Sequence, residues 1–371
     1  MLELPRETAR RSRLGLLVNS FSWPLRTSHY LGLLDPLWSS HTPQGRVQAL
    51  VDETRDARSL MLRPGRGWLR HRPGQYVRLG VSIAGRQHVR TYSLSSAPER
   101  LEEDGCITIT VKAIAEGFIS GHLVREIGRG EYLRLGQPQG DFVLPQAAPV
   151  RPLFITAGSG ITPVMSMLRS FDARGELPDI VHLHYARRPD ELIFGSELAD
   201  LAKAHSRYRL QVVYTRAASE AGSSRRRFTS RQLDIGCPDW KERDVYACGP
   251  QPLLGAVESH WQQAGLASRL HVERFRAVLA EPPRQAGGGR VSFRRSGCAT
   301  EADASRSLLR VAEAAGLSPP YGCRMGICHS CTTTLRAGCV RDLRNNRLID
   351  EPGAKVQICV CAAAGNVELE L

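Results

Sequence analysis

Apolar and polar side chains alternate along the chain between about residue 45 and residue 112. Five short runs have this period of two, and glycine or proline turns separate them. Successive side chains of a strand point to opposite faces, so the pattern is typical of half-buried strands, and strands this short favour a small antiparallel barrel. The expected strands are 47–51, 59–62, 75–79, 89–94 and 106–112.

The pattern changes near residue 149. Apolar runs that favour buried strands then alternate with helical stretches. This alternation is typical of an open parallel sheet covered by helices. The expected strands are 153–157, 180–185, 210–214 and 244–247. We therefore expect a barrel at 45–148 and an α/β domain at 149–279.

A third unit follows a linker at 280–289, which is rich in proline and then in glycine. A strand at 291–293 and a helix at 307–315 precede a loop rich in cysteine. We expect a small α+β domain at 290–371. The pair Ala337-Gly338 suggests a hairpin turn, which would make the nearby Cys339 a structural thiol.

The first 44 residues contain no cofactor motif. They begin with several arginines and continue with apolar residues, among them Tyr30-Leu31 and the segment from Asp35 to Ser39. One interpretation is a docking arm for a membrane or a partner protein. The simpler one, which we favour, is an extension that packs on the next domain.

Charge and cysteine content narrow the functional classes. The net charge of +13 implies affinity for a phosphorylated cofactor, an acidic protein or an anionic membrane surface. Nucleic acid is disfavoured because the basic residues are dispersed and aromatic residues make up only 6%. Ten cysteines with no secretory signal and no run of membrane-spanning length favour a reducing compartment. We expect a cytoplasmic protein, with a peripheral position on the inner face of the membrane as the alternative.

Three cysteines in the third unit have the spacing C-x4-C-x2-C, which matches the plant-type [2Fe-2S] pattern. They are Cys323, Cys328 and Cys331. Gly322 and Gly326 give the loop the freedom to fold three thiolates inward. A zinc site would more often show two C-x2-C pairs, so we interpret the motif as an iron–sulfur site.

The fourth ligand must lie further along, and the spacing leaves both Cys359 and Cys361 open. The segment Cys359-Val360-Cys361-Ala362 resembles the turn of plant-type ferredoxin domains in which the leading cysteine binds the cluster. The resemblance favours Cys359, and it implies a β-grasp fold for 290–371.

Two motifs in the barrel point to a flavin. Arg90-Thr91-Tyr92-Ser93 lies on an expected strand, and Gly117-Phe118-Ile119-Ser120 opens an expected helix whose N-terminal amides could hold a pyrophosphate. Together with Pro73-Gly74-Gln75-Tyr76 they resemble the flavin domain of the ferredoxin–NADP reductase superfamily. The resemblance implies FAD, with Arg90 on its pyrophosphate, Tyr92 against the ring, Ser93 near the reactive N5 atom and residues 117–120 around the diphosphate.

Two motifs in the α/β domain point to a pyridine nucleotide. A strand leads into Gly158-Ser159-Gly160-Ile161-Thr162-Pro163 and a helix, and a later strand ends at Cys248-Gly249-Pro250. The order of strand, glycine turn and helix is the context of a nucleotide pyrophosphate site. In the reductase superfamily the same motifs surround the nicotinamide, which implies that Cys248, with Ser93, lies at the reacting atoms.

The sequence favours NADPH over NADH. No Asp or Glu stands at the end of the second expected strand, where an NAD-type ribose contact would lie. The resemblance assigns the 2′-phosphate to Thr215-Arg216 and to a residue near Arg227, which could also belong to a solvated loop. It further implies that Phe275 covers the flavin.

These motifs predict an enzyme that passes electrons from NADPH through FAD and [2Fe-2S] to an acceptor protein. The chain resembles the reductase partners of acyl-CoA desaturases, partly through the segment at 24–39, so we expect a membrane fatty-acyl desaturase or a related di-iron hydroxylase as acceptor. The alternative is a soluble ring-hydroxylating or other oxygenase.

Overall fold

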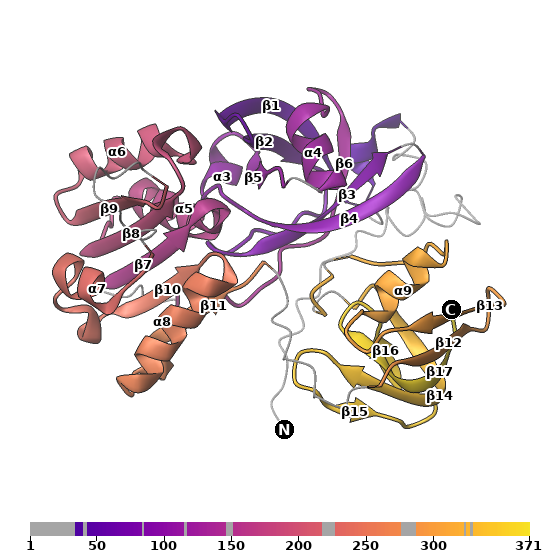
Figure 1. The fold of residues 1–371 in the computed structure, drawn as a ribbon. Coiled ribbons are helices and arrows are strands. Elements are labelled where there is room, and N and C mark those ends of the chain that lie inside the picture. The colour runs from indigo at the N-terminus through magenta and orange to yellow at the C-terminus, as the bar shows by residue number, and fades with distance from the viewer. Residues whose placement is uncertain are drawn as a thin grey trace, which may run out of the picture.

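The computed structural model describes residues 34–39, 43–83, 85–114, 117–145, 151–216, 227–275, 287–322, 324–326 and 329–371. Three sheets form, and each belongs to its own unit: a barrel, an α/β domain and a C-terminal domain (Figure 1). The expected fold class is confirmed. Within the described residues, no helix is both long enough and apolar enough to span a bilayer.

The barrel is a six-stranded antiparallel sheet in the order β4-β3-β6-β1-β2-β5. Its strands are β1 (Gln44–Thr54), β2 (Ala57–Pro64), β3 (Tyr76–Ile83), β4 (Arg86–Ser93), β5 (Ile107–Lys112) and β6 (Tyr132–Leu135), and its helices are α3 (Arg100–Glu103) and α4 (Phe118–Arg125). A bridge between Leu94 and Ile109 joins the two sheet edges and closes the barrel. The sequence analysis missed β6, which is four residues long, although its burial alternates strictly.

The inner face of the barrel explains why the period of two specifies it. Leu60, Leu62, Leu79, Ile107 and Ile109 are at most 1% exposed and belong to one core cluster. Each such side chain contributes about 1.5–3 kcal/mol relative to an exposed position. A shift of one residue in register would turn them to solvent, so their burial fixes the register of strands β2, β3 and β5.

Part of the N-terminal extension packs on the barrel. The short 3-10 helix η1 (Pro36–Trp38) lies against Gly65 and Arg66, and the backbone N–H of Arg66 donates to the Leu37 carbonyl at 2.7 Å. A Cβ atom on Gly65 would lie 2.4 Å from that carbonyl oxygen, so the contact requires glycine. For these residues the structure agrees with an extension packed on the next domain. Residues 1–33 and 40–42 lie outside the described part.

The α/β domain is a five-stranded parallel sheet in the order β11-β10-β7-β8-β9. Its strands are β7 (Pro152–Ala157), β8 (Ile180–Ala186), β9 (Tyr208–Tyr214), β10 (Asp244–Cys248) and β11 (Leu270–Glu273). Its helices are α5 (Ile161–Ala173), α6 (Gly195–Ala204), α7 (Ser230–Gly236) and α8 (Gln251–Gln263), with 3-10 turns η2 (Gly158–Gly160), η3 (Pro189–Glu191), η4 (Trp240–Glu242) and η5 (Ala267–Arg269). The order in which strands are added to the sheet reverses between β7 and β10. Ligands of such sheets bind at the carboxyl ends of the strands beside that point.

Strand β8 contains a buried histidine pair. Thr156 Oγ1 lies 2.7 Å from both His182 Nε2 and His184 Nδ1, and Tyr208 OH lies 2.8 Å from His182 Nδ1. Burial lowers the pKa of both imidazoles, that of His184 to about 4. They are packed, neutral histidines.

Helix α5 connects the α/β domain to the barrel. Ser166 Oγ donates to the Ser96 carbonyl at 2.7 Å, and Arg169 Nη1 donates to the Ser95 carbonyl at 2.8 Å. Ser95 and Ser96 follow directly after β4, the strand that carries Arg90 to Ser93. The helix that begins at the glycine turn is therefore fixed against the segment that follows β4.

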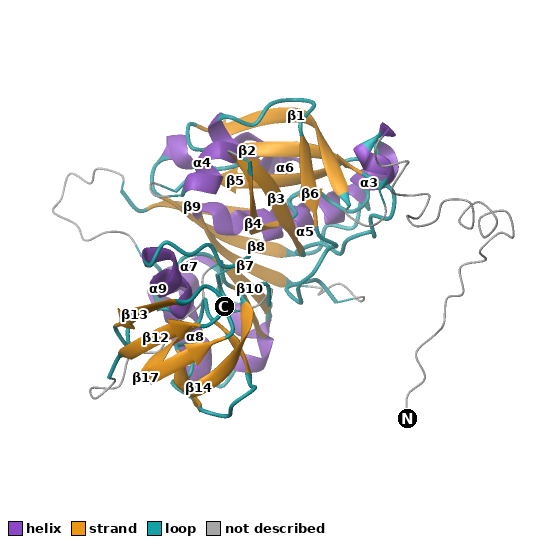
Figure 2. Cartoon of the chain, turned by 90° about the vertical axis from the view of Figure 1, so that its right-hand side faces the viewer, coloured by secondary structure: helices purple, strands orange, loops and turns teal. Residues whose placement is uncertain are grey.

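The C-terminal domain forms a separate layer of strands around one helix (Figure 2). Its elements are β12 (Gly289–Phe293), β13 (Cys298–Ala302), α9 (Leu308–Ala314), β14 (Thr332–Asp342), β15 (Leu348–Ile349), β16 (Lys355–Gln357) and β17 (Cys361–Leu369). Strands β12 and β17 are parallel and their other partners antiparallel, which gives the expected mixed sheet. The hairpin turn expected at Ala337-Gly338 is wrong: β14 runs through it. Gly338, with φ of 85°, forms a bulge in β14, and its backbone lies close to that of Asn366. A glycine inside a strand often marks a bulge or a close backbone approach of this kind.

Candidate functional site

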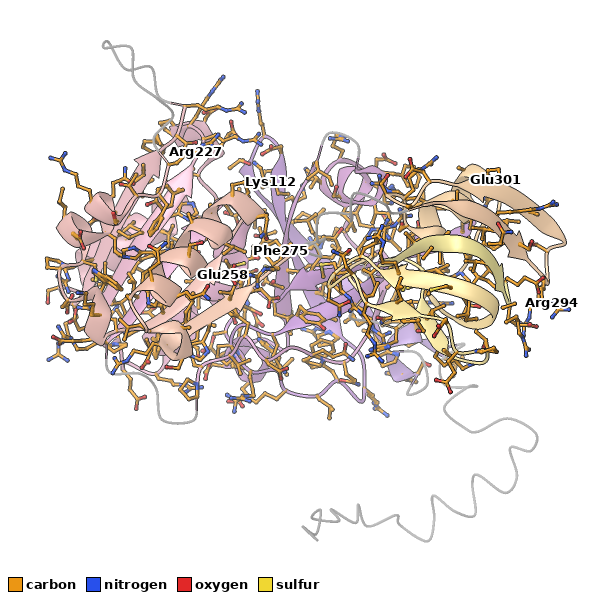
Figure 3. All side chains as sticks on the ribbon, turned by 60° about the horizontal axis from the view of Figure 1, so that its bottom comes forward. Lys112, Arg227, Glu258, Phe275, Arg294 and Glu301 are labelled. Atoms are coloured by element: carbon orange, nitrogen blue, oxygen red, sulfur yellow. The ribbon has the colours of Figure 1, made fainter. Side chains whose placement is uncertain are left out.

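One cavity of about 260 Å³ gathers side chains from all three domains, and we call it the junction cavity. Its lining comprises Tyr76, Thr91 and Ser93 of the barrel, Val272, Glu273, Arg274 and Phe275 of the α/β domain, and Met325 of the cysteine loop. Figure 3 shows Phe275 at the boundary between the α/β domain and the barrel. Three of the predicted site residues, Thr91, Ser93 and Phe275, therefore meet here.

The polar groups of this cavity fit a flavin ring. The Ser93 side chain is buried, and within the described residues its hydroxyl has no hydrogen-bond partner. Leaving a buried hydroxyl unpaired is costly, so a ligand with polar edge atoms would satisfy it. Thr91 lies two residues earlier on the same face of β4, and the Phe275 ring supplies apolar contact. The cavity thus combines the flat apolar wall and the polar edge that a flavin requires.

Tyr92 lies on the other face of β4. It packs against the barrel core and does not line the junction cavity. Burial raises the pKa of its phenol and outweighs the opposing effect of Arg90. A direct contact between Tyr92 and the flavin ring remains a prediction.

The sequence analysis missed Glu273, a half-buried carboxyl group in the junction cavity. Burial, and then the nearby Asp141, raise its pKa to about 7. Its strand β11 pairs in register with β10, which places Glu273 opposite Cys248. The sequence could have indicated Glu273 by its position, because it stands at the end of the last strand, two residues before the predicted site residue Phe275.

Cys248 is fully buried at the carboxyl end of β10. Burial and the neighbouring Glu273 raise the pKa of its thiol well above the usual value. The thiol therefore stays protonated near neutral pH, and its position beside the nicotinamide remains a prediction.

The predicted diphosphate residues lie at the start of α4 and on β4. Helix α4 begins at Phe118, directly after Gly117, so its first amides are available to an anion. The Ser120 hydroxyl is used locally, because it donates to the Gly117 carbonyl at 3.1 Å and accepts from Ile114 N at 3.3 Å. Arg90 is half-buried and donates to the Val89 carbonyl at 2.8 Å. Their contacts with FAD remain predictions.

The two glycine motifs of the α/β domain touch each other at the point where the strand order reverses. A Cβ atom on Gly160 would lie 2.2 Å from the Cys248 carbonyl oxygen and 2.8 Å from Gly249 N, so this approach requires glycine. Gly158 has φ of 54°, a left-handed conformation that glycine adopts easily. Thr162 Oγ1 donates to the Ser159 carbonyl at 2.9 Å and stabilises the turn, and Pro163 lies in the first turn of α5. The motifs thus form one nucleotide-binding edge, which Pro250 joins as the N-cap of α8.

Arginines gather at the ends of β8 and β9. The backbone N–H of Thr215 donates to the Ala186 carbonyl at 2.8 Å, and that of Arg216 donates to the Arg187 carbonyl at 2.9 Å. These bonds bring Arg216 beside Arg187-Arg188, which the sequence analysis missed although the pair directly follows the second strand. Arg227 lies before α7 at the outer edge of the domain (Figure 3). In the described part of the chain, neither Arg216 nor Arg227 forms an ion pair, so both can receive an anion.

Two of the predicted cluster ligands, Cys323 and Cys328, lie outside the described residues. Cys331, Cys359 and Cys361 are all buried. The backbone N–H of Ile358 donates to the Cys331 carbonyl at 3.3 Å, which brings the segment of Cys359 to that of Cys331. This arrangement fits a site built from the loop and the turn, and the choice of Cys359 remains a prediction.

Arg344 and Val360, which lie outside the cysteine loop, contact it at Gly326. A Cβ atom on Gly326 would lie 2.8 Å from Val360 Cγ2, and Gly326 has φ of 73°, so the position requires glycine. Arg344 Nη1 donates to the Gly326 carbonyl at 3.2 Å, while its Nη2 pairs with Asp342 at 2.6 Å. Arg324 and His329 adopt left-handed backbone conformations at either side of the loop. Such strain is typical of a loop whose shape serves a bound group.

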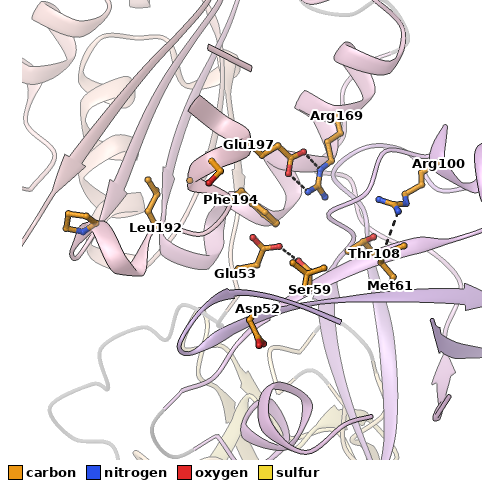
Figure 4. A pocket seen from close by; sticks show the side chains of 14 residues that line it. Asp52, Glu53, Ser59, Met61, Arg100, Thr108, Arg169, Leu192, Phe194 and Glu197 are labelled. Atoms are coloured by element: carbon orange, nitrogen blue, oxygen red, sulfur yellow. Dashed lines mark hydrogen bonds and ion pairs between the residues drawn. The ribbon is translucent and has the colours of Figure 1, made fainter. Parts of the chain in front are cut away.

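A larger cavity, of about 630 Å³, lies between the β1–β2 hairpin and the start of α6 (Figure 4). Arg169 pairs with Glu197 at 2.6 Å on its wall, and Ser59 Oγ donates to Glu53 at 2.6 Å. Burial raises the pKa of Glu53 despite the bond from Ser59. No predicted cofactor residue lines this cavity, so its size does not mark the site.

Comparisons with known proteins agree with this arrangement. The chain matches models of the oxidoreductase FAD-binding domain at residues 46–144, the oxidoreductase NAD-binding domain at 154–259 and the 2Fe-2S iron-sulfur cluster binding domain at 292–364. It is 46% identical over 349 residues to an NADPH oxidoreductase of Mycobacterium tuberculosis, covering 94% of this chain and 89% of that protein. It is 30% identical over 346 residues to the glycine betaine monooxygenase reductase subunit of Pseudomonas aeruginosa, covering 88% and 94%.

A solved structure, that of phthalate dioxygenase reductase, has a similar fold. The TM-score is 0.60 at 24% identity, and the match covers 89% of this chain and 98% of that one. The order of the three matched domains and the similarity over nearly the whole chain lead to one assignment: the protein belongs to the ferredoxin reductase superfamily, as an NAD(P)H-dependent FAD and [2Fe-2S] oxidoreductase.

Proposed function

We propose that this protein is the NADPH-dependent reductase component of an oxygenase system. The observation that carries the proposal is the junction cavity, whose lining comes from the flavin strand, the end of the nucleotide domain and the cluster loop. A reductase that receives electrons from a nucleotide and passes them to a cluster needs a meeting point of this composition.

The chain's own residues bind and orient. Bound FAD supplies a carrier that takes two electrons at once and gives them up singly, which matches NADPH to a one-electron cluster. Ser93 is placed to hydrogen-bond the ring, and the amides that begin α4 to hold the diphosphate. Gly160 and Gly249 let the nucleotide approach the sheet edge closely. The protonated Cys248 thiol fills space there, and the step requires no thiolate.

An oxygenase is supported as acceptor by the relatives. The subunit from Pseudomonas aeruginosa is the reductase of a monooxygenase, and it matches this chain over most of its length. The desaturase expected from the sequence finds no support among the relatives. The N-terminal segment that suggested a docking arm packs on the barrel where it is described, which removes part of that argument.

The preference for NADPH rests on charge. Arg216, Arg187 and Arg188 lie together at the ends of β8 and β9, with no acidic residue at the end of β8 itself. The 2′-phosphate is dianionic, so the guanidinium groups of Arg216 and Arg188, which form no ion pair within the described residues, would attract it through charge-assisted hydrogen bonds, whereas Arg187 already pairs with Glu191.

The proposal is tested on the purified full chain. We expect about one FAD and about two irons per chain, and NADPH-driven reduction of cytochrome c. The protein is then combined with an oxygenase component and, in parallel, with membranes that contain an acyl desaturase, and NADPH-dependent product is measured in each. Turnover with the oxygenase supports the proposal. Turnover with the desaturase membranes alone would show that the acceptor is a desaturase and not an oxygenase. A protein that binds neither flavin nor iron after anaerobic reconstitution would refute the assignment as a reductase.

A further inference from the structure

The barrel and the C-terminal domain are joined by a stack of two arginines on one tyrosine. The guanidinium carbon of Arg90 lies 4.8 Å from the centre of the Tyr321 ring, and that of Arg324 lies 4.1 Å from the same centre. Arg90 Nη1 also lies 3.4 Å from the Gly322 carbonyl, to which it donates. Arg90 belongs to β4 of the barrel, whereas the other residues belong to the cluster loop.

The two arginines differ in their charge partners. Arg324 forms a bidentate ion pair with Glu313 on α9. Arg90 has no carboxylate partner within the described residues; its guanidinium donates to the Val89 and Gly322 carbonyls and interacts with the Tyr321 hydroxyl. An arginine on an aromatic face is favourable, but it still lacks a negative charge. Arg90 is therefore held in place by the cluster loop while its charge remains available to an anion.

A second contact ties the same loop to the flavin site. Met325 lines the junction cavity together with Thr91 and Ser93. A thioether packs well against the edge or face of an aromatic ring. The loop thus reaches the barrel at two points, the predicted diphosphate arginine and the predicted ring site, and both would touch the same FAD molecule.

We propose that Tyr321 is a positioning residue that couples FAD binding to docking of the cluster loop, by fixing the side chain of Arg90. The inference rests on the proposed function, because it requires FAD at Arg90. Tyr321 occupies the face of the guanidinium and leaves N–H groups at its edge for the diphosphate. An arginine that is already ordered loses less side-chain entropy when the diphosphate binds. Bound FAD, in return, stabilises the Arg90 conformation on which the loop docks.

Thermodynamic linkage makes the coupling reciprocal, so Tyr321 strengthens FAD binding by the same factor by which FAD strengthens docking. A cation–π contact of this kind corresponds to about a fivefold change in an equilibrium constant. We expect Tyr321→Leu to raise the dissociation constant of FAD about fivefold. Tyr321→Phe keeps the aromatic face and should remain within about twofold of the wild type.

The experiment uses the full chain with its cluster, with and without FAD. The dissociation constant is measured by quenching of flavin fluorescence. Hydrogen exchange is measured for peptides that cover 321–326, and FAD should slow exchange there in the wild type and in Tyr321→Phe, with a weaker effect in Tyr321→Leu. A matched control is Tyr132→Leu, since the guanidinium carbon of Arg46 lies 6.0 Å from the centre of the Tyr132 ring on the same barrel, and this stack does not involve Arg90. This control should change neither quantity.

The outcomes separate the inference from the function. FAD that binds Tyr321→Leu as tightly as wild type, with exchange at 321–326 unaffected by FAD, would overturn the coupling and leave the reductase assignment intact. A wild-type chain that binds no FAD would refute both. If Tyr321→Leu fails to fold or to retain its cluster, the exchange of the wild type with and without FAD decides, because the coupling requires protection of the loop by FAD.

Discussion

Replacing Arg216 with alanine should weaken the use of NADPH and leave that of NADH nearly unchanged. The backbone at Arg216 is fixed to Arg187, but its side chain is exposed and has no ion-pair partner within the described residues. A hydrogen bond to a charged group contributes about 1.5–3 kcal/mol, and solvent screening reduces this to about 1–2 kcal/mol at an exposed site. The KM for NADPH should therefore rise about 5- to 30-fold.

The assay is the initial rate of ferricyanide reduction at saturating acceptor, with each nucleotide varied in turn. Arg209→Ala is a matched control, because Arg209 lies near the start of β9, the strand that precedes Arg216, and pairs with Asp179 at 3.0 Å. The control should leave both KM values unchanged. An equal rise for NADPH and NADH in Arg216→Ala would show that Arg216 binds the pyrophosphate or supports the fold, and no change for either would place the 2′-phosphate elsewhere.

Three further predictions address the cluster, the buried histidines and the junction cavity. Cys359→Ala should lose the visible absorption of the cluster and keep NADPH-to-dye activity, while Cys361→Ala keeps both; the reverse result would move the ligand to Cys361. His182 and His184 are neutral when folded, whereas unfolded histidines titrate near pH 6.5, so stability should be full above that value and fall as the pH decreases. His184, whose pKa is about 4, accounts for a loss of up to about 3 kcal/mol toward pH 4, and His182 adds to the loss. Thermal denaturation that is identical for wild type and His184→Asn across this range would contradict the sign. Burial gives Glu273 a pKa of about 7, so the rate of flavin reduction by NADPH should change between about pH 6 and pH 8, and a Glu273→Gln variant with the same pH profile would exclude this group as the cause.

The sequence predicts the parts of this molecule that depend on local chemistry. Gly158 and Gly160 can be found because the turn between β7 and α5 tolerates little else, and the strands follow from apolar periodicity. The two errors in the predicted strands and turns also come from relying on local sequence patterns. Gly338 suggested a turn because glycine commonly breaks strands, but here it allows close approach to Asn366, a residue distant in sequence. The strand β6 was missed because four residues give too short a pattern.

The residues that only the structure identifies act through tertiary contacts. Glu273 has a perturbed pKa because of burial and Asp141, and neither is visible in a motif. Met325 lies between two predicted cluster ligands, and only the docking of the C-terminal domain brings it to Ser93. Tyr321 gains its proposed role in FAD binding because Arg90 of another domain lies on its ring. A motif search assigns each domain its own cofactor, but it carries no information on which side chains meet between domains.

The flavin site is joined to the nucleotide domain through a paired sheet and to the cluster loop through single side chains. These two kinds of contact suit hydride transfer and electron transfer, respectively. Cys248 and Glu273 face each other across paired parallel strands, and Phe275 follows two residues later, so the sheet itself would fix the predicted nicotinamide site relative to the wall of the predicted flavin site. Hydride transfer demands such rigidity, because the reacting atoms must lie about 3–3.5 Å apart in an aligned geometry. The cluster loop, in contrast, meets the barrel through the Arg90–Tyr321 stack, the bond from Arg90 to Gly322 and the Met325 contact, which single side chains can make or break. An electron transfer step moves no atom between the groups, so the chain can place its adjustable interface there without loss of the geometry on which the hydride depends.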